Sequence, residues 1–99
     1  MKSIISNIDK FFESRVRLGI MSILMIHEKV DFNTLKDTLN LTDGNLASHL
    51  RALENKKYTE YNKTFSGRKT LTTYRATEKG KAAFSEHLNA LEKLIKEQK

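Results

Sequence analysis

Residues 41–53 constrain the fold more than any other segment, because their apolar side chains recur at the spacing of a helix that buries one face. On a wheel of 3.6 residues per turn, three leucines fall within about 40° of one direction: Leu46, Leu50 and Leu53. The far side carries small, polar or cationic residues, namely Gly44, Ser48 and Arg51. Thr42 is a good N-cap for this segment. We therefore predict a helix over residues 42–56 whose outer face can approach the surface of a partner closely.

A shorter helix precedes this segment. The pattern predicts it over residues 33–39, with Asn33 as its cap. Just before the cap, Val30 and Phe32 alternate as they would in a short edge strand. Two helices joined by a short turn form the helix-turn-helix pattern, in which the second helix can enter the major groove of DNA.

Positive charge is concentrated in one quarter of the chain. The 99 residues include 18 Lys and Arg against 12 Asp and Glu, which gives a formal net charge of +6 and a pI near 9.7. Residues 51–75 hold seven cations and two glutamates, which leaves +5 in this segment. Its cations are Arg51, Lys56, Lys57, Lys63, Arg68, Lys69 and Arg75. Such a focus of charge favours a polyanion as the partner.

The same quarter of the chain predicts a β-hairpin. Residues 58–65 alternate between two sets of side chains, and β-favouring residues return in residues 70–76. Between the two runs, Gly67 permits the positive φ that a hairpin turn requires. Arg68 and Lys69 follow this glycine directly. We expect a hairpin whose tip, at residues 65–70, is basic.

Apolar residues at helical spacing also open and close the chain. They predict a helix over residues 4–12, and Ser14 can cap a second helix that runs to about Glu28. Thr77 can cap a closing helix over residues 78–96, whose apolar stripe is wider than docking on a small domain requires. We expect helices 4–12 and 78–96 to pair two subunits. Their candidate interface residues are Ile4, Ile8, Phe11, Phe84, Leu88, Leu91 and Ile95.

Several classes of protein are disfavoured by what the sequence lacks. It has no cysteine, which excludes disulfides and thiolate metal ligands. Its three histidines are scattered, so we predict neither a metal site nor any other cofactor. Without a glycine-rich phosphate loop or a catalytic constellation, the chain is not expected to be an enzyme. The apolar run at residues 18–26 is far shorter than the roughly 20 residues of a membrane span. We expect one cytoplasmic domain over residues 1–99, with no membrane partner.

The order of these elements and four sequence segments resemble the small winged-helix transcriptional regulators related to the MarR and ArsR groups. The segments are VRLGI at 16–20, DFNTL at 31–35, LTDGNLASHL at 41–50 and GRKTLTTYRATEKG at 67–80. The resemblance covers about residues 10–90. It implies an α+β, mostly helical fold: a winged helix-turn-helix with a two- or three-stranded antiparallel wing and flanking N- and C-terminal helices.

The same resemblance implies a homodimeric, sequence-specific DNA-binding regulator of transcription, usually a repressor. Metal-sensing members carry clusters of Cys or His, and none is visible in this sequence. A small-molecule effector leaves no signature that the sequence could reveal. Two alternatives stay open at this stage: a winged-helix module that docks a protein, and an RNA-binding domain, although no surface run of aromatics for stacking bases is evident.

The candidate DNA-binding residues lie on the outer face of the predicted helix 42–56 and on the hairpin: Thr42, Gly44, Asn45, Ser48, Arg51, Lys63, Arg68 and Lys69. Base edges in the major groove are read by hydrogen bonds, and Arg51 could pair with guanine and Asn45 with adenine. The tip cations could enter a minor groove or meet phosphates. Capping alone explains Thr42, and Lys63 is equally consistent with an ordinary solvated strand residue.

Overall fold

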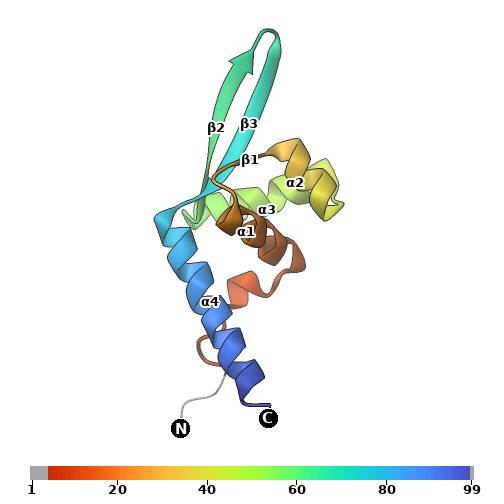
Figure 1. Cartoon of the computed structure of the whole chain (residues 1–99). Helices are drawn as coiled ribbons and strands as arrows, with labels where there is room; N and C mark the ends of the chain where they lie inside the picture. Colours follow the sequence, from red (N-terminus) through yellow and green to blue (C-terminus); the bar gives the residue numbers. More distant parts are fainter. Residues whose placement is uncertain (1–4, 99) are drawn as a thin grey trace.

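The computed structural model describes residues 5–98 as a body of helices with a long hairpin projecting from one end (Figure 1). In chain order the elements are η1 (Lys10–Glu13), α1 (Arg15–Ile26), β1 (Val30–Asp31), α2 (Phe32–Leu39), α3 (Asp43–Asn55), β2 (Thr59–Ser66), β3 (Lys69–Ala76) and α4 (Glu78–Lys96). The strands form one antiparallel sheet in the order β1-β3-β2. We call the β2–β3 hairpin the wing. This is the predicted α+β, mostly helical winged helix-turn-helix, with three strands.

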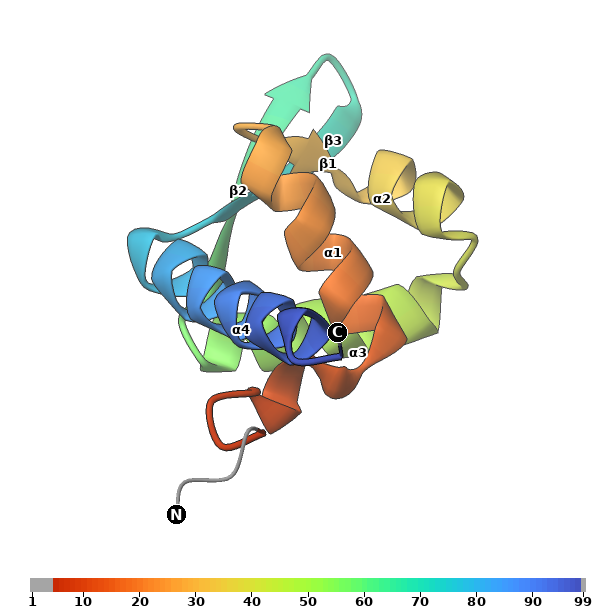
Figure 2. The ribbon, with the colours of Figure 1, turned by 60° about the horizontal axis from the view of Figure 1, so that its bottom comes forward.

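Helix α1 occupies the middle of the body, with α2 on one side and α4 on the other (Figure 2). The core between them consists of buried apolar side chains, namely Phe12, Ile20, Met21, Leu24, Leu35, Leu46, Leu50, Leu53, Ala76 and Phe84. Every element except β1 and β2 contributes a residue to this set. The three leucines of α3 are at most 1% exposed, which confirms the predicted inward face of that helix.

Three helix starts are confirmed by their caps. The side chains of Ser14, Thr42 and Thr77 each accept a hydrogen bond from the backbone N–H three residues later, at 3.3, 3.2 and 3.0 Å. These bonds satisfy N–H groups that have no partner within the helix. Helix α1 ends at Ile26, two residues before the predicted end.

The predicted cap of α2 is wrong by two residues. Asp31, rather than Asn33, precedes the helix, and its carboxylate accepts from the Thr34 backbone N–H at 3.1 Å and from the Thr34 hydroxyl at 2.6 Å. The hydroxyl bond is the largest of the effects that lower the pKa of Asp31. Because β1 pairs with β3 only through Val30 and Asp31, the helix begins as soon as this pairing ends, at Phe32.

The predicted helix over residues 4–12 is also wrong. Ile4 lies outside the described residues, and the chain from residue 5 forms turns followed by the short helix η1. Asp9 caps η1 by accepting from the Phe11 N–H at 2.9 Å, and its own N–H donates to Nδ1 of His87 at 3.0 Å. Phe12 is then drawn into the core, with its ring 5.2 Å from that of Phe84. Side-chain capping and aromatic burial thus compete successfully with a helix too short to be stable by itself.

Candidate nucleic-acid interface

The outer face of α3 is open to solvent. Gly44, Ser48 and Arg51 are all exposed, as the helical spacing predicted. An added Cβ at Gly44 would meet no other atom within 4 Å, so nothing in the fold itself requires glycine at this position. The small residues leave the backbone of α3 accessible to a partner.

The turn between α2 and α3 contains a backbone hydrogen bond and an ion pair. Asn40 ends α2 in the left-handed region at φ 54°, a conformation that asparagine tolerates better than most residues. Leu41 then donates its N–H to the Lys36 carbonyl at 3.0 Å. The Lys36 ammonium also lies 2.9 Å from the Asp43 carboxylate in the first turn of α3, and this contact raises the pKa of Lys36. The two helices of the motif are therefore tied at their junction.

A groove runs between α3 and the wing, with a volume of about 400 Å³. We call it the α3–wing groove. It is lined from α3 by Ala47, Leu50, Arg51 and Glu54, and from the wing by Tyr61, Lys63, Thr72 and Tyr74. Burial raises the pKa of Glu54, whereas the neighbouring Arg51 lowers it. Two predicted residues from different elements, Arg51 of α3 and Lys63 of β2, thus meet in one groove.

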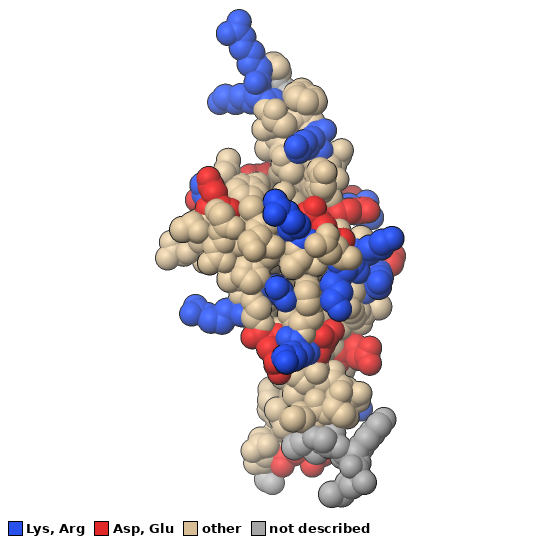
Figure 3. All heavy atoms as spheres, turned by 180° about the vertical axis from the view of Figure 1, so that it is seen from behind, with Lys and Arg blue, Asp and Glu red and all other residues tan. Residues whose placement is uncertain are grey.

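The tip of the wing is a two-residue turn. Ser66 and Lys69 are paired, and Gly67 between them adopts φ 63°, which confirms the predicted positive φ. Arg68 and Lys69 are both exposed. Lys and Arg side chains stand at the end of the wing and recur further down the same face of the molecule, with acidic residues among them on the body (Figure 3).

Two of the predicted residues are placed differently from the rest. Asn45 lines a separate hollow, with Arg15 and Val16 of α1 and the α2–α3 turn. It therefore lies on the side of α3 away from the wing. Thr42 is exposed, but its hydroxyl is engaged in capping α3 at the Asn45 N–H.

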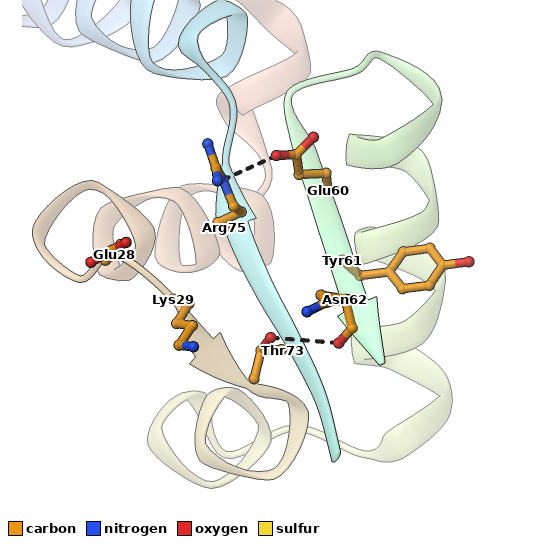
Figure 4. A pocket seen from close by; sticks show the side chains of 7 residues that line it. All are labelled: Glu28, Lys29, Glu60, Tyr61, Asn62, Thr73 and Arg75. Carbon is orange, nitrogen blue, oxygen red and sulfur yellow. Dashed lines mark hydrogen bonds and ion pairs between the residues drawn. The ribbon is translucent and has the colours of Figure 1, made fainter. Parts of the chain in front are cut away.

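The opposite face of the wing forms another hollow, of about 360 Å³ (Figure 4). Two contacts join residues of this hollow: the Arg75 Nε lies 3.0 Å from Glu60 Oε1, and the Thr73 hydroxyl donates to the Asn62 backbone carbonyl at 3.5 Å. Tyr61 points away from these side chains, toward α3 (Figure 4). Alternate residues of the strands thus serve two different surfaces, and only one of them faces α3.

Sequence reasoning missed the aromatic part of the α3–wing groove. The rings of Tyr61 and Tyr74 lie 6.1 Å apart on the wing face toward α3, and Tyr61 is 53% exposed. The alternation of β2 could have revealed this, because it places Tyr61 and Lys63 on one face. It could not reveal which face turns toward α3.

Some of the candidate interface residues for a second subunit are buried within their own chain, whereas others are exposed. Phe84 is 1% exposed in the core of its own chain and so is not available to a partner. Phe11 is half-buried against Phe12 and Tyr58, with the Arg17 guanidinium 4.2 Å from its ring centroid, and Ile8 is half-buried as well. The other three candidates on α4 reach the surface: Leu88 and Ile95 are exposed and Leu91 is half-buried.

Helix α3 is tied to α1 through His49. Its Nδ1 accepts from the Arg17 Nε at 3.2 Å, and His49 is half-buried. Burial lowers the pKa of His49, and the positive charge of Arg17 lowers it further. His87, by contrast, is 2% exposed and its Nδ1 accepts from the Asp9 N–H, so its ring is not available to a second subunit.

We expect the free energy of unfolding to fall on acidification through His49. Because the folded pKa is below the ordinary value of 6.5, folding favours the neutral ring. The stabilisation is complete above pH 6.5 and is lost as the pH falls through the folded pKa. Urea denaturation at pH 7.5 and at pH 5 should show a smaller loss for His49→Gln than for the wild type. His27→Gln, at the exposed end of α1, is the matched control. An identical loss in both variants would contradict this assignment.

The chain belongs to the winged helix DNA-binding domain family, whose model matches residues 16–95. The family and the fold are those of DNA-binding transcriptional regulators, as the resemblance implied. Among residues 5–98, no helix combines the length and the apolar character needed to cross a bilayer.

The chain is also similar to individual proteins. An uncharacterized protein of Methanocaldococcus jannaschii is 39% identical over 87 residues, which span 88% of this chain and 95% of the relative. The solved structure of a transcriptional regulator homologue from Pyrococcus horikoshii OT3 has a TM-score of 0.86 at 30% identity, and the match covers 96% of this chain and 92% of that one. The YusO protein of Bacillus subtilis, at 14% identity and a TM-score of 0.77, shares the fold over 96% of this chain and 67% of its own.

Proposed function

We propose that this protein is a homodimeric, sequence-specific regulator that binds duplex DNA, reads the major groove with α3 and contacts the backbone or minor groove with the wing. The observation that carries the proposal is the α3–wing groove, in which Arg51 and Lys63 meet. A duplex held there would face the small, polar surface of α3 and the cations of the wing at the same time. We further propose that it acts as a repressor, because a protein that covers adjacent grooves excludes other proteins from the same site.

Each candidate residue has a distinct role in this proposal. Arg51 supplies paired donors to a guanine edge, and Ser48 lies one turn earlier on the same face. Gly44 keeps the start of α3 close to the bases. Lys63, Arg68 and Lys69 meet phosphates or the minor groove from the wing. Asn45 reads a base on the side of α3 near Arg15, and Thr42 acts by fixing the first turn of the helix.

Two subunits would place two copies of α3 in successive major grooves. The proposed contact is a stripe on α4 that consists of the exposed Leu88 and Ile95 and the half-buried Leu91. Phe84 is not part of this stripe, because it belongs to the core. Isologous pairing of this stripe would produce a two-fold axis. A palindromic site with half-sites about 34 Å apart would match that symmetry.

The proposed dimer can be tested by placing charged residues in the apolar stripe of α4. In sedimentation, the wild type is expected to be a dimer at tens of micromolar protein, and the double variant Leu88→Glu with Ile95→Glu a monomer. Its affinity for a palindromic site should fall by roughly 100-fold, because the second half-site no longer binds as part of the same molecule. Lys93→Glu changes the charge of α4 without altering the stripe and should stay dimeric. A monomeric wild type would contradict the proposed contact.

The DNA-binding function itself is tested by selecting bound sequences from a random duplex library. We expect a palindromic consensus, which we call the operator, and much weaker binding to unrelated duplexes at the same salt concentration. The same sequence made as duplex RNA should bind poorly, because the deep, narrow major groove of A-form RNA does not admit α3. Failure to enrich any sequence, or a preference for RNA, would contradict the proposal.

A further inference from the structure

The side chain of Phe65, on the wing, is not buried by the fold. It is 77% exposed, whereas the other four phenylalanines are buried or half-buried: Phe11, Phe12, Phe32 and Phe84. Its partner across the hairpin is Thr70, which offers the ring little cover. A large aromatic side chain that stays in water loses the stabilisation that burial would provide. This exposure therefore points to a partner that covers the ring.

The ring lies on the face of the wing that carries the α3–wing groove. Tyr61 and Lys63 of β2 line that groove, and Phe65 is the next residue with the same parity along the strand. Successive side chains of a strand alternate between faces, so these three residues share one face. Leu71, paired with Thr64, lies on the other face.

The charge around Phe65 selects the kind of partner. Residues 61–77 contain four cations and no acidic residue. The cations nearest to Phe65 in the sequence are Lys63, Arg68 and Lys69, all of them exposed. Desolvating these charges against an apolar protein surface would be unfavourable, whereas a nucleic acid neutralises them. The occupant of this surface is thus expected to combine phosphates with an apolar component.

We propose that Phe65 packs on deoxyribose at the mouth of the minor groove and thereby selects DNA over RNA. This inference rests on the function proposed above. With about 3.4 Å per residue, Phe65 lies about 7 Å behind the tip of the wing, and the minor groove of B-DNA is about 7.5 Å deep. When Arg68 reaches toward the floor, the ring therefore lies at the groove edge, where the sugars are. A ribose would place a 2′-hydroxyl in that minor groove, which an aromatic ring cannot satisfy.

The test uses the selected operator with single ribonucleotides placed next to the site of the wing. Hydroxyl-radical footprints of the wild type and Arg68→Ala locate that site. Phe65→Ala is expected to bind the all-DNA operator about tenfold more weakly than the wild type, as the loss of an apolar contact implies. The slope of affinity against salt should stay unchanged, whereas Arg68→Ala should reduce it by about 1. Leu71→Ala, which removes an exposed apolar side chain from the other face, should bind like the wild type.

The ribonucleotide substitutions identify the contact. The wild type should lose affinity at the substituted positions, and Phe65→Ala should be indifferent to them. If Phe65→Ala binds the operator like the wild type, or keeps the ribonucleotide effect, the inference is overturned. A greater loss of affinity for single-stranded DNA than for the duplex would also overturn it, because the ring would then stack on bases. In each of these cases, the proposed function would still be supported if an operator is selected and binding to it depends on Arg51. The absence of any operator would contradict both the inference about Phe65 and the proposed function.

Discussion

Substitution of Gly80 by alanine is expected to destabilise the fold by about 3 kcal/mol, at the upper end of what overpacking usually causes. A Cβ at Gly80 would lie 2.0 Å from the carbonyl oxygen of Tyr58 and 2.9 Å from its Cα. These are backbone atoms, which cannot rotate away as a flexible side chain can. Relief therefore requires α4 to move away from the start of β2.

That movement would break the joint between α4 and the wing. The same Tyr58 carbonyl accepts from the Thr77 N–H at 3.0 Å, and the Thr77 hydroxyl donates to the Lys57 carbonyl at 2.7 Å. Thermal unfolding should show the effect as a drop in Tm of roughly 12 to 24 °C for a domain of this size.

Gly44→Ala is the matched control, since both glycines lie in the first turn of a helix. Nothing lies within 4 Å of a Cβ at Gly44, so alanine should stabilise α3 by about 0.5–1 kcal/mol through its helix propensity. Similar Tm values for the two variants would show that the close approach at Gly80 is not what requires glycine.

Substitution of Arg51 by alanine is expected to weaken binding to the operator by roughly 1 to 3 kcal/mol and to relax the base preference at one position of each half-site. Arg51 is exposed and lines the α3–wing groove, and it does not belong to the buried core. The loss should therefore appear in DNA binding and not in the free energy of unfolding. Repeating the selection with the variant protein would identify the position that Arg51 reads.

Arg75→Ala separates base reading from net charge. It removes the same charge, but Arg75 is paired with Glu60 on the wing face away from α3. We expect it to leave the selected consensus unchanged. If both variants lose the same affinity and keep the same consensus, Arg51 contributes charge only and α3 does not read bases through it.

Local signals in the sequence were sufficient for the starts of α1, α3 and α4 and for the wing. The caps Ser14, Thr42 and Thr77 act on N–H groups three residues away, so no other part of the chain is needed to predict them. The same holds for Gly67, where a two-residue turn needs a residue that tolerates positive φ. The error at α2 arose where pairing of β1 with β3 fixed the start of the helix.

Helical periodicity predicted which face of each helix is apolar, but not which part of that face is covered by the rest of the molecule. The apolar stripe of α4 was correctly spaced, yet Phe84 packs in the core while Ile95 is 70% exposed. The spacing is the same for both residues. Their exposure differs because the body covers only part of the length of α4. The molecule is accordingly elongated, 58 Å long and only 25 by 21 Å across.

The sequence by itself determined the wing, the starts of α1, α3 and α4 with their caps, the inward face of α3 and the concentration of positive charge, since each depends on residues that lie near one another in the chain. Only the tertiary structure decided that Arg51 and Lys63 share a groove, that Gly80 touches the backbone at Tyr58, and that Phe65 lies on the same side as α3. These relations depend on the direction in which the wing leaves the body. That direction is set by packing between distant segments, which no local pattern encodes.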